Sequence, residues 1–160
     1  MTLIRQPTPF DDPEWIFEIK HDGFRAFAVI ERGHCRFISR KKFKLYGLRD
    51  LAAALAREVS AETAILDGEL AVPDHLGRTV FAAMMKGGHE ARYFGFDLVS
   101  LNGEDLRQLP LLTRKQRLRR ILPTRSPHVL YVNHARGSGT DLYRFAYQLD
   151  QEGIGHGLSE

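Results

Sequence analysis

The sequence predicts an α+β domain built largely on antiparallel sheet, and three observations indicate this class. Residues 15–20 alternate apolar and polar side chains with the two-residue period of a strand. Residues 48–59 repeat Leu or Val every three to four positions, as one face of a helix does. Turn pairs such as Asp22-Gly23 separate several short apolar runs. Strands and helices do not alternate regularly, so a parallel βαβ series is not expected.

The first three strands are expected to form an antiparallel meander. Asp22-Gly23 is a typical hairpin pair and would turn the first strand into the second. Arg32-Gly33 would turn the second strand into the third. The three strands are expected at residues 15–20, 24–30 and 35–39.

The rest of the chain is expected to supply the helices and the longer strands. Asn102-Gly103 marks a further turn, and the last helix is expected to carry Leu142, Phe145 and Leu149 inward. In order, the expected elements are a helix at 48–59, strands at 64–72 and 93–101, a basic helix at 113–122, a strand at 128–135 and a helix at 140–151.

The composition is that of one ordinary globular domain of 160 residues, with 43% apolar and 27% charged side chains. Its one cysteine, Cys35, excludes an intrachain disulfide, so a reducing cytoplasm is the expected compartment. No apolar run has the length of a signal-peptide core or a membrane span, so no membrane partner is expected. The formal charge of +3 allows a polyanionic partner, but the favoured interpretation of the basic residues at 114–120 is the solvated face of a helix.

Lys20 is the first candidate for chemistry. It ends a strand, with Glu18 two residues before it and Arg25 five residues after it. Glu18 and Lys20 share a strand face, opposite to Phe17 and Ile19, which are expected in the core. An amine attacks only in its neutral form, which partial desolvation and a neighbouring cation favour. Lys20 is therefore a candidate nucleophile for an anionic substrate, and a solvated ion pair with Glu18 at a hairpin tip is the alternative.

Two further strands carry acids among apolar residues. Asp67 and Glu69 share a face, where paired acids are costly to bury unless they bind a cation or a hydroxyl donor; an exposed sheet face is the alternative. Asp97 interrupts a long apolar run and needs a partner. Phe94 and Phe96 precede it, either as core residues or with one of them as a flat platform for a nucleobase.

These stretches occur in one order, and together they resemble the nucleotidyltransferase (adenylation) domain of ATP-dependent DNA ligases of the bacterial repair and end-joining type. The stretch EIKHDGFRA resembles the lysine motif K-x-D-G-x-R of that family, and SRKK at 39–42 resembles its S-R element. LDGEL matches the acidic motif, and YFGFDLVSLNGEDL matches the aromatic-FDLL stretch. The likeness runs from Pro13 to Ile154 and implies the ATP-grasp-like nucleotidyltransferase variant of the α+β class.

The resemblance implies an ATP-dependent DNA ligase in DNA repair and recombination, in a bacterial cytoplasm near the nucleoid. Lys20 would attack the α-phosphate of ATP, form lysyl-AMP and pass AMP to the 5′-phosphate of nicked double-stranded DNA. The implied cofactors are ATP and Mg²⁺ or Mn²⁺. The other implied roles are Glu18 beside the adenine, Phe96 stacked on it, Arg25 and Arg40 at the ribose and phosphates, Glu69 at the ribose or a divalent metal, and Glu152 at the metal.

The last motif departs from the family pattern, which reads roughly E-G-[IV]-V-x-K. Here the sequence is EGIGHG, so Gly157 stands where the family has lysine, and His156 is a less favoured substitute for that cation. We therefore expect one C-terminally truncated adenylation domain over residues 1–160, without the fifth motif or an oligonucleotide-binding domain. A separate chain that supplies these functions would be a further partner. The alternative function is a catalytically impaired remnant that binds nucleotide or DNA without turnover.

Overall fold

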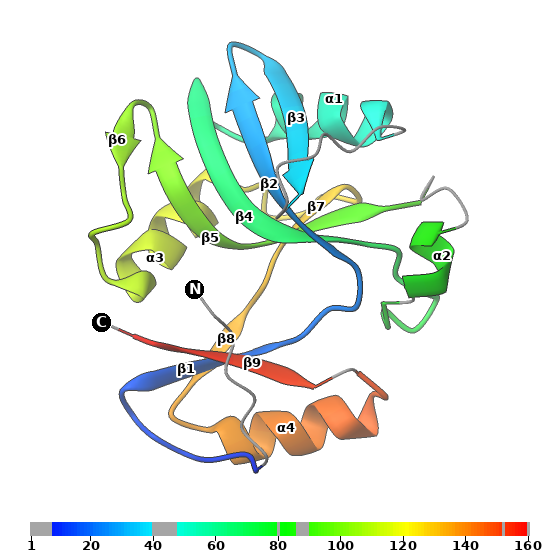
Figure 1. Cartoon of the computed structure of the whole chain (residues 1–160), viewed down its shortest axis with the longest axis vertical. Helices are drawn as coiled ribbons and strands as arrows, with labels where there is room; N and C mark the ends of the chain where they lie inside the picture. The colour runs from blue at the N-terminus through cyan, green and yellow to red at the C-terminus, as the bar shows by residue number, and fades with distance from the viewer. Residues whose placement is uncertain (1–7, 40–47, 80, 86–89, 152, 160) are drawn as a thin grey trace.

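Two β-sheets form the framework of the structure, a computed structural model that describes residues 8–39, 48–79, 81–85, 90–151 and 153–159. In this part of the chain the small sheet has the strand order β8-β1-β9, and the large sheet has the order β3-β2-β4-β5-β6 with β7 beside β5. Figure 1 shows the small sheet below the large one, with α4 under it. The strands are β1 (Trp15–Ile19), β2 (Phe24–Glu31), β3 (His34–Ser39), β4 (Thr63–Ala71), β5 (Arg92–Leu101), β6 (Glu104–Asp105), β7 (Val129–Tyr131), β8 (His134–Arg136) and β9 (Ile154–Leu158). The helices are α1 (Arg49–Glu58), α2 (Phe81–Met85), α3 (Leu111–Ile121) and α4 (Gly139–Gln148).

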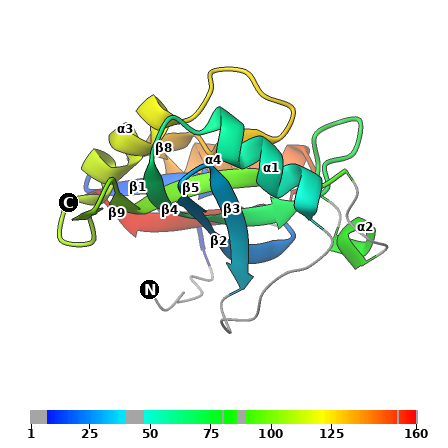
Figure 2. The same cartoon turned by 90° about the horizontal axis from the view of Figure 1, so that it is seen from above.

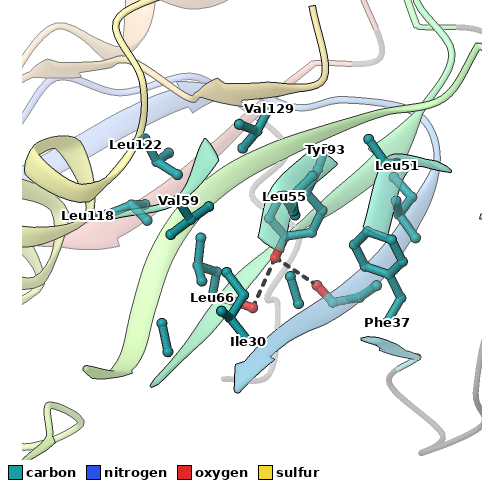
Figure 3. Packing of buried hydrophobic residues seen from close by; sticks show 14 of the residues in the cluster. Ile30, Phe37, Leu51, Leu55, Val59, Leu66, Tyr93, Leu118, Leu122 and Val129 are labelled. Carbon is teal, nitrogen blue, oxygen red and sulfur yellow. Dashed lines mark hydrogen bonds between the residues drawn. The ribbon is translucent and has the colours of Figure 1, made fainter. Parts of the chain in front are cut away.

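The main hydrophobic core lies between the large sheet and the helices α1 and α3, which Figure 2 shows on the same side of that sheet. Leu55 of α1, Leu66 of β4 and Leu118 of α3 are fully buried there. Tyr93 of β5 is also fully buried, and its hydroxyl lies 3.1 Å from the carbonyl oxygen of Ala26 and 2.9 Å from that of Leu66 (Figure 3). Because a buried phenol needs such a partner, Tyr93 helps to hold β2, β4 and β5 side by side.

The predicted α+β class is confirmed, and so are two of the predicted turns. Arg32 and Gly33 have φ of 48° and 77°, and Asn102 and Gly103 have φ of 47° and 87°. Positive φ at both central residues is the geometry of the tight hairpin turn that matches the twist of the flanking strands. Helix α1 buries Leu51 and Leu55, as the spacing predicts.

The hairpin predicted at Asp22-Gly23 is wrong, because β1 and β2 belong to different sheets. β1 pairs with β8 and β9, whereas β2 pairs with β3 and β4. Gly23 permits a close approach of backbones, since a Cβ on it would overlap the carbonyl oxygen of Leu70 in β4. The segment from Lys20 to Gly23 is therefore a crossover between two sheets.

β1 is the central strand of the small sheet, and both of its faces are covered. Phe17 is buried as predicted, but Ile16 on the opposite face is buried as well, and Ile19 is only partly buried. A strand covered on both sides does not keep the simple apolar-in, polar-out pattern.

The strand predicted at 128–135 is two strands in different sheets. β7 runs parallel to β5 in the large sheet, and β8 runs antiparallel to β1 in the small one. Val132 lies between them, and its N–H donates to the carbonyl oxygen of Gly95 at 2.9 Å. The large sheet is therefore mixed rather than purely antiparallel.

Helix α4 packs through small residues, so the inward position predicted for Phe145 and Leu149 is wrong, and Leu142 is only partly buried. Phe145 and Leu149 are 50% and 40% exposed, whereas Gly139 and Ala146 are buried. Gly139 lies against Phe17 of β1, where a Cβ would come within 2.7 Å of the ring atom Cδ1. The helix approaches the strand closely because these residues lack bulk, and its large apolar side chains then lie outside the contact.

Helix α2 is not predicted by the sequence pattern, because its five residues are too few to show a period. No helix within the described ranges is both long enough and apolar enough to cross a membrane.

Candidate functional site

Lys20 lies where the chain leaves the small sheet for the large one. Its side chain is exposed, directly after the last residue of β1. Its backbone N–H donates to the carbonyl oxygen of Gly153 at 2.9 Å, and the N–H of Asp22 donates to Oγ1 of Thr79 at 2.7 Å. The crossover is therefore anchored at two points, and Lys20 is held at the junction of the sheets rather than at a hairpin tip.

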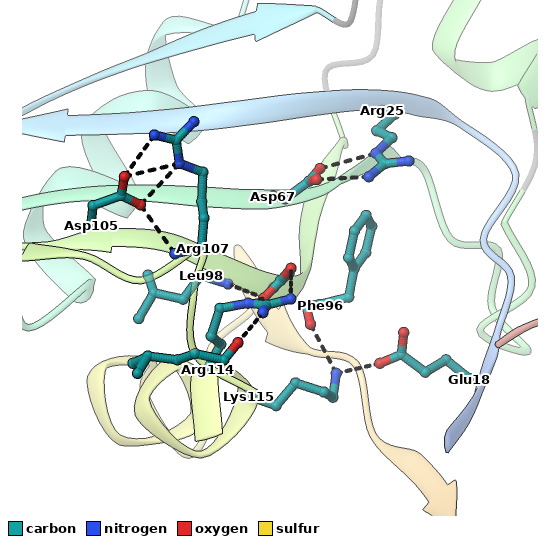
Figure 4. Close-up of polar contacts among 11 residues, drawn as sticks. Glu18, Arg25, Asp67, Phe96, Leu98, Asp105, Arg107, Arg114 and Lys115 are labelled. Atoms are coloured by element: carbon teal, nitrogen blue, oxygen red, sulfur yellow. Dashed lines mark hydrogen bonds and ion pairs between the residues drawn. The ribbon is translucent and has the colours of Figure 1, made fainter. Parts of the chain in front are cut away.

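Arg25 and Asp67 form a two-bond ion pair between β2 and β4. Nε of Arg25 donates to Oδ1 of Asp67 at 3.1 Å, and Nη2 donates to Oδ2 at 2.7 Å (Figure 4). The hydrogen bonds to Asp67 raise the pKa of Arg25, so the guanidinium keeps its charge. The guanidinium carbon also lies 5.3 Å from the centre of the Phe96 ring. Arg25 is thus a fixed cation beside an aromatic ring.

The two acids of the LDGEL stretch have different environments. Asp67 is 7% exposed, and its carboxylate accepts the bonds from Arg25, so the predicted cation partner of this acid is a protein side chain. Glu69 is partly exposed and lies opposite Arg25 in the β2–β4 register. It also lies opposite Phe94 in the β4–β5 register. Glu69 is therefore the more accessible of the two acids.

The two phenylalanines of β5 also differ. Phe94 is 7% exposed and stacks on the ring of His21, with the ring centres 4.1 Å apart and the planes 28° from parallel. Burial lowers the pKa of His21 to about 4, so this ring is neutral at physiological pH. Phe96 is partly exposed. Phe94 is thus a core residue, and Phe96 keeps the more accessible ring.

Glu18 is bound by a lysine that sequence reasoning assigned to a possible solvated helix face. Lys115 of α3 is fully buried. Its Nζ forms an ion pair with Glu18 and donates to the carbonyl oxygen of Phe96 at 2.9 Å (Figure 4). It also donates to the carbonyl oxygen of Val132 at 3.3 Å. Burial raises the pKa of Glu18, and the charge of Lys115 opposes that rise. The one sequence signal for a buried Lys115 is its place three residues before the buried Leu118, on the same face of the helix.

Asp97 has the partner that its apolar surroundings predict. Arg114 of α3 donates from Nε to Oδ1 of Asp97 at 2.9 Å and from Nη2 to Oδ2 at 3.0 Å. Farther along the helix, Arg117 pairs with an acid of β6, and Arg119 and Arg120 are exposed. Most of the positive charge of α3 therefore holds the helix to the sheet, and the solvated-face interpretation fails for Arg114 and Lys115.

Two glycines of β9 lie on the face of the small sheet that carries Glu18. Gly155 lies directly opposite Glu18, and Gly157 lies two residues farther along β9. A Cβ on Gly155 would meet nothing within 4 Å, whereas a Cβ on Gly157 would lie 3.0 Å from Cδ2 of Leu111. The position where the family motif has lysine is thus bordered by an apolar side chain.

His156 lies between these glycines and faces the other side of β9. Its ring packs edge-on against Phe10 and Trp15, with ring centres 5.4 and 5.1 Å apart. The idea that His156 substitutes for the missing lysine is therefore wrong.

The predicted site residues Arg40 and Glu152 lie outside the described residues. Within the described part of the chain, no group of three or more His, Cys, Asp and Glu side chains is arranged to hold a metal ion. Glu69 offers a partly exposed carboxylate opposite Arg25. Such a donor set fits Mg²⁺, which commonly binds through one or two carboxylates together with substrate phosphates and water.

Comparison with known proteins agrees with the motifs. The model of the family described as ATP dependent DNA ligase domain matches residues 7–154. The multifunctional non-homologous end joining protein LigD of Pseudomonas aeruginosa is 35% identical over 160 residues, covering 96% of this chain and 19% of that protein. The SPbeta prophage-derived DNA ligase-like protein LigB of Bacillus subtilis is 28% identical over 156 residues, covering 91% of this chain and 55% of that protein.

Solved structures share the fold. The ligase domain of Mycobacterium tuberculosis LigD superposes with a TM-score of 0.77 at 25% identity, covering 94% of this chain and 50% of that chain. A mycobacterial DNA ligase D complexed with ATP and MES gives a TM-score of 0.76 at 24% identity with the same coverage. The chain thus spans half of each solved chain and 19% of the P. aeruginosa protein. Because the family model covers nearly all of the sequence, the chain belongs to the ATP dependent DNA ligase domain family.

Proposed function

We propose that the chain adenylates itself on Lys20, the first step of ATP-dependent DNA ligation. The observation that carries the proposal is that Lys20 is exposed and anchored at the junction of the two sheets. Its neutral Nζ attacks the α-phosphorus of ATP and forms an N–P bond, while the bond from that phosphorus to the bridging oxygen breaks. Pyrophosphate leaves, and the proton of the amine passes to solvent.

The side chains around Lys20 suit a nucleotide. Phe96 has the accessible ring on which the adenine would stack, and Glu18 would lie beside the base. Arg25, charged and fixed by Asp67, would bind the ribose and phosphate region together with Arg40.

Glu69 and Glu152 are the proposed carboxylates for the ribose or for the divalent metal. Bound there with the phosphates, Mg²⁺ or Mn²⁺ would offset the charge that develops on the α-phosphate.

The AMP group would then pass from Lys20 to the 5′-phosphate of nicked double-stranded DNA, and the 3′-hydroxyl would displace AMP to seal the nick. The names of the relatives support this substrate and its use in repair, since LigD is named for non-homologous end joining. A structural neighbour is a DNA ligase complexed with ATP.

Intact-protein mass spectrometry tests the proposal. The purified chain is incubated with ATP and Mg²⁺ and desalted, and its intact mass is measured. We expect a gain of one adenylyl group, which added pyrophosphate reverses and which EDTA prevents. The same adduct is then offered a nick with a 5′-phosphate, and transfer of AMP to the DNA is read on a gel. Absence of any adduct at millimolar ATP would contradict the proposal.

A catalytically impaired remnant is the second candidate function. It is favoured by Gly157, which offers no cation where the family motif has lysine, and by Leu111 beside it. This candidate predicts that the chain binds ATP in a calorimeter and yet forms no adduct, with or without a separate chain that supplies C-terminal ligase functions.

A further inference from the structure

Going beyond the proposed function but resting on it, we propose that Lys115 is a positioning residue that orients the Glu18 carboxylate for the nucleotide base. Lys115 lies on α3, outside the sequence motifs that contain Lys20, Glu69 and Phe96. It would act through Glu18 and would not touch the reacting atoms at Lys20.

The ammonium group of Lys115 joins three separate segments. Its acceptors are the Glu18 carboxylate on β1, the carbonyl oxygen of Phe96 on β5, and the carbonyl oxygen of Val132 between β7 and β8. β1 belongs to the small sheet and β5 to the large one. Lys115 therefore links the two sheets, and its contact with the small sheet is at Glu18, two residues before Lys20.

The hydrogen bonding of Lys115 is complete. An ammonium has three N–H donors, and three acceptors surround this one. The Nζ also lies 4.9 Å from the centre of the Tyr131 ring, and the guanidinium of Arg119 lies 5.1 Å from the same ring. Such a fully bonded group has little freedom to move, so it fixes the position of the Glu18 oxygen that it holds.

Stability alone does not account for this arrangement. The Lys115 side chain is 1% exposed and that of Glu18 is 22% exposed. Removing two charges from water costs about as much as their attraction returns, and an apolar pair of similar volume is often equally stable. A buried ion pair at this point of the fold is better explained by the geometry that it imposes on Glu18.

The proposal separates binding from chemistry. If Lys115 acts only on Glu18, and Glu18 lies beside the base, loss of the ammonium weakens nucleotide binding and leaves the attack by Lys20 nearly unchanged at saturating ATP. General damage to α3 has the opposite signature, because it lowers the fraction of folded protein and so lowers kcat without changing KM.

Lys115→Met removes the charge and keeps the length of the side chain. Arg117→Met is the matched control, since Arg117 lies on the same helix and pairs with the exposed Glu104. Leu118→Ala supplies a core lesion on the same helix. For each variant, the exchange of labelled pyrophosphate into ATP, which turns over the reversible adenylation step, gives KM and kcat. Calorimetry gives the Kd of α,β-methylene-ATP, which cannot transfer AMP, and thermal unfolding gives Tm.

We expect Lys115→Met to raise KM and the analogue Kd about tenfold or more, as the loss of a charge-assisted contact does, with kcat within about threefold of wild type. Arg117→Met should match wild type, and Leu118→Ala should lower Tm with little change in KM. An unchanged KM in folded Lys115→Met overturns the proposal.

A double variant keeps the test decisive if Lys115→Met does not fold. Glu18→Gln/Lys115→Met leaves no unpaired charge and is compared with Glu18→Gln alone. Equal KM values support action through Glu18 alone, and a further tenfold rise in the double variant contradicts it.

The outcomes also separate the two proposals. If wild type forms the adduct and Lys115→Met has wild-type KM, only the role of Lys115 fails. If wild type binds the analogue but forms no adduct, self-adenylation fails, and the Kd of Lys115→Met still decides the role of Lys115. If wild type binds no analogue, both fail.

Discussion

Phe94 and Phe96 are two residues apart on β5, and the structure predicts opposite consequences for the same substitution. Phe96→Ala removes the more accessible ring, which lies beside the Arg25 guanidinium. Phe94→Ala removes a ring that is 7% exposed and stacked on His21. The first change is expected to weaken nucleotide binding, and the second is expected to destabilise the fold.

The magnitudes follow from burial. Stacking of a base on an aromatic side chain contributes about 1–3 kcal/mol, so Phe96→Ala should raise the Kd for α,β-methylene-ATP by about 5- to 150-fold. Truncation of a fully buried Phe costs about 3–5 kcal/mol, which for a chain of this size lowers Tm by about 6–20 °C in Phe94→Ala. Phe96 is only partly buried, so its truncation should cost about 1–2 kcal/mol of stability.

Calorimetry with the analogue and thermal unfolding of both variants measure these two effects separately. Temperatures well below both Tm values keep the binding comparison between folded proteins. If Phe96→Ala binds the analogue as wild type does and instead unfolds as readily as Phe94→Ala, then Phe96 is a core residue and the assignment of the base platform is refuted.

Three further predictions concern the crossover and the basic helix. Gly23→Ala should lower Tm strongly, because the new Cβ would overlap the carbonyl oxygen of Leu70. The control Gly155→Ala should leave Tm nearly unchanged, because a Cβ there meets nothing within 4 Å. Equal Tm values for the two variants would contradict the crossover geometry. The pKa of His21 is lowered from the ordinary 6.5 to about 4, so the wild type should become less stable as pH falls from 6.5 to 4, because the unfolded chain takes up a proton that the folded chain does not. The loss of unfolding free energy is about 2 kcal/mol after allowance for partial exposure. Urea unfolding of His21→Phe should show a flatter dependence of stability on pH, and a dependence equal to that of wild type would contradict the prediction. Any affinity for DNA should be insensitive to sequence and steeply reduced by salt. Arg120→Glu, on the exposed part of α3, should reduce both the DNA affinity and its dependence on salt concentration. DNA binding that persists in high salt would contradict an electrostatic contact.

Features set by neighbouring residues are predictable from the sequence. The turns at Arg32-Gly33 and Asn102-Gly103 and the buried face of α1 depend on local backbone geometry and a local period, and the structure has them where the pattern puts them. The need of Asp97 for a partner also follows from its apolar neighbours alone, although the identity of Arg114 does not.

The sequence does not predict in the same way which of the two sheets a segment joins, because that depends on residues far apart in the chain. A glycine that permits a turn and one that permits a close approach are the same residue type, so Gly23 suggested a hairpin where the chain crosses between sheets. The run at 128–135 has no residue that marks its passage from one sheet to the other. For the same reason Lys115 resembles its solvated neighbours in sequence, and only the packing of α3 against both sheets shows that it is buried beside Glu18.

The most direct measurement of the central claim is the location of the adenylyl group. Three proteins are incubated with ATP and Mg²⁺: wild type, Lys20→Ala and Lys20→Arg. The intact mass of each is measured, and its peptides are then sequenced by tandem mass spectrometry after digestion. Wild type should carry one adenylyl group on the peptide that contains Lys20, and neither variant should carry any, because Ala has no amine and a guanidinium stays protonated. An adduct that persists in Lys20→Ala, or that maps to another residue in the wild type, would contradict the assignment of Lys20 as the nucleophile.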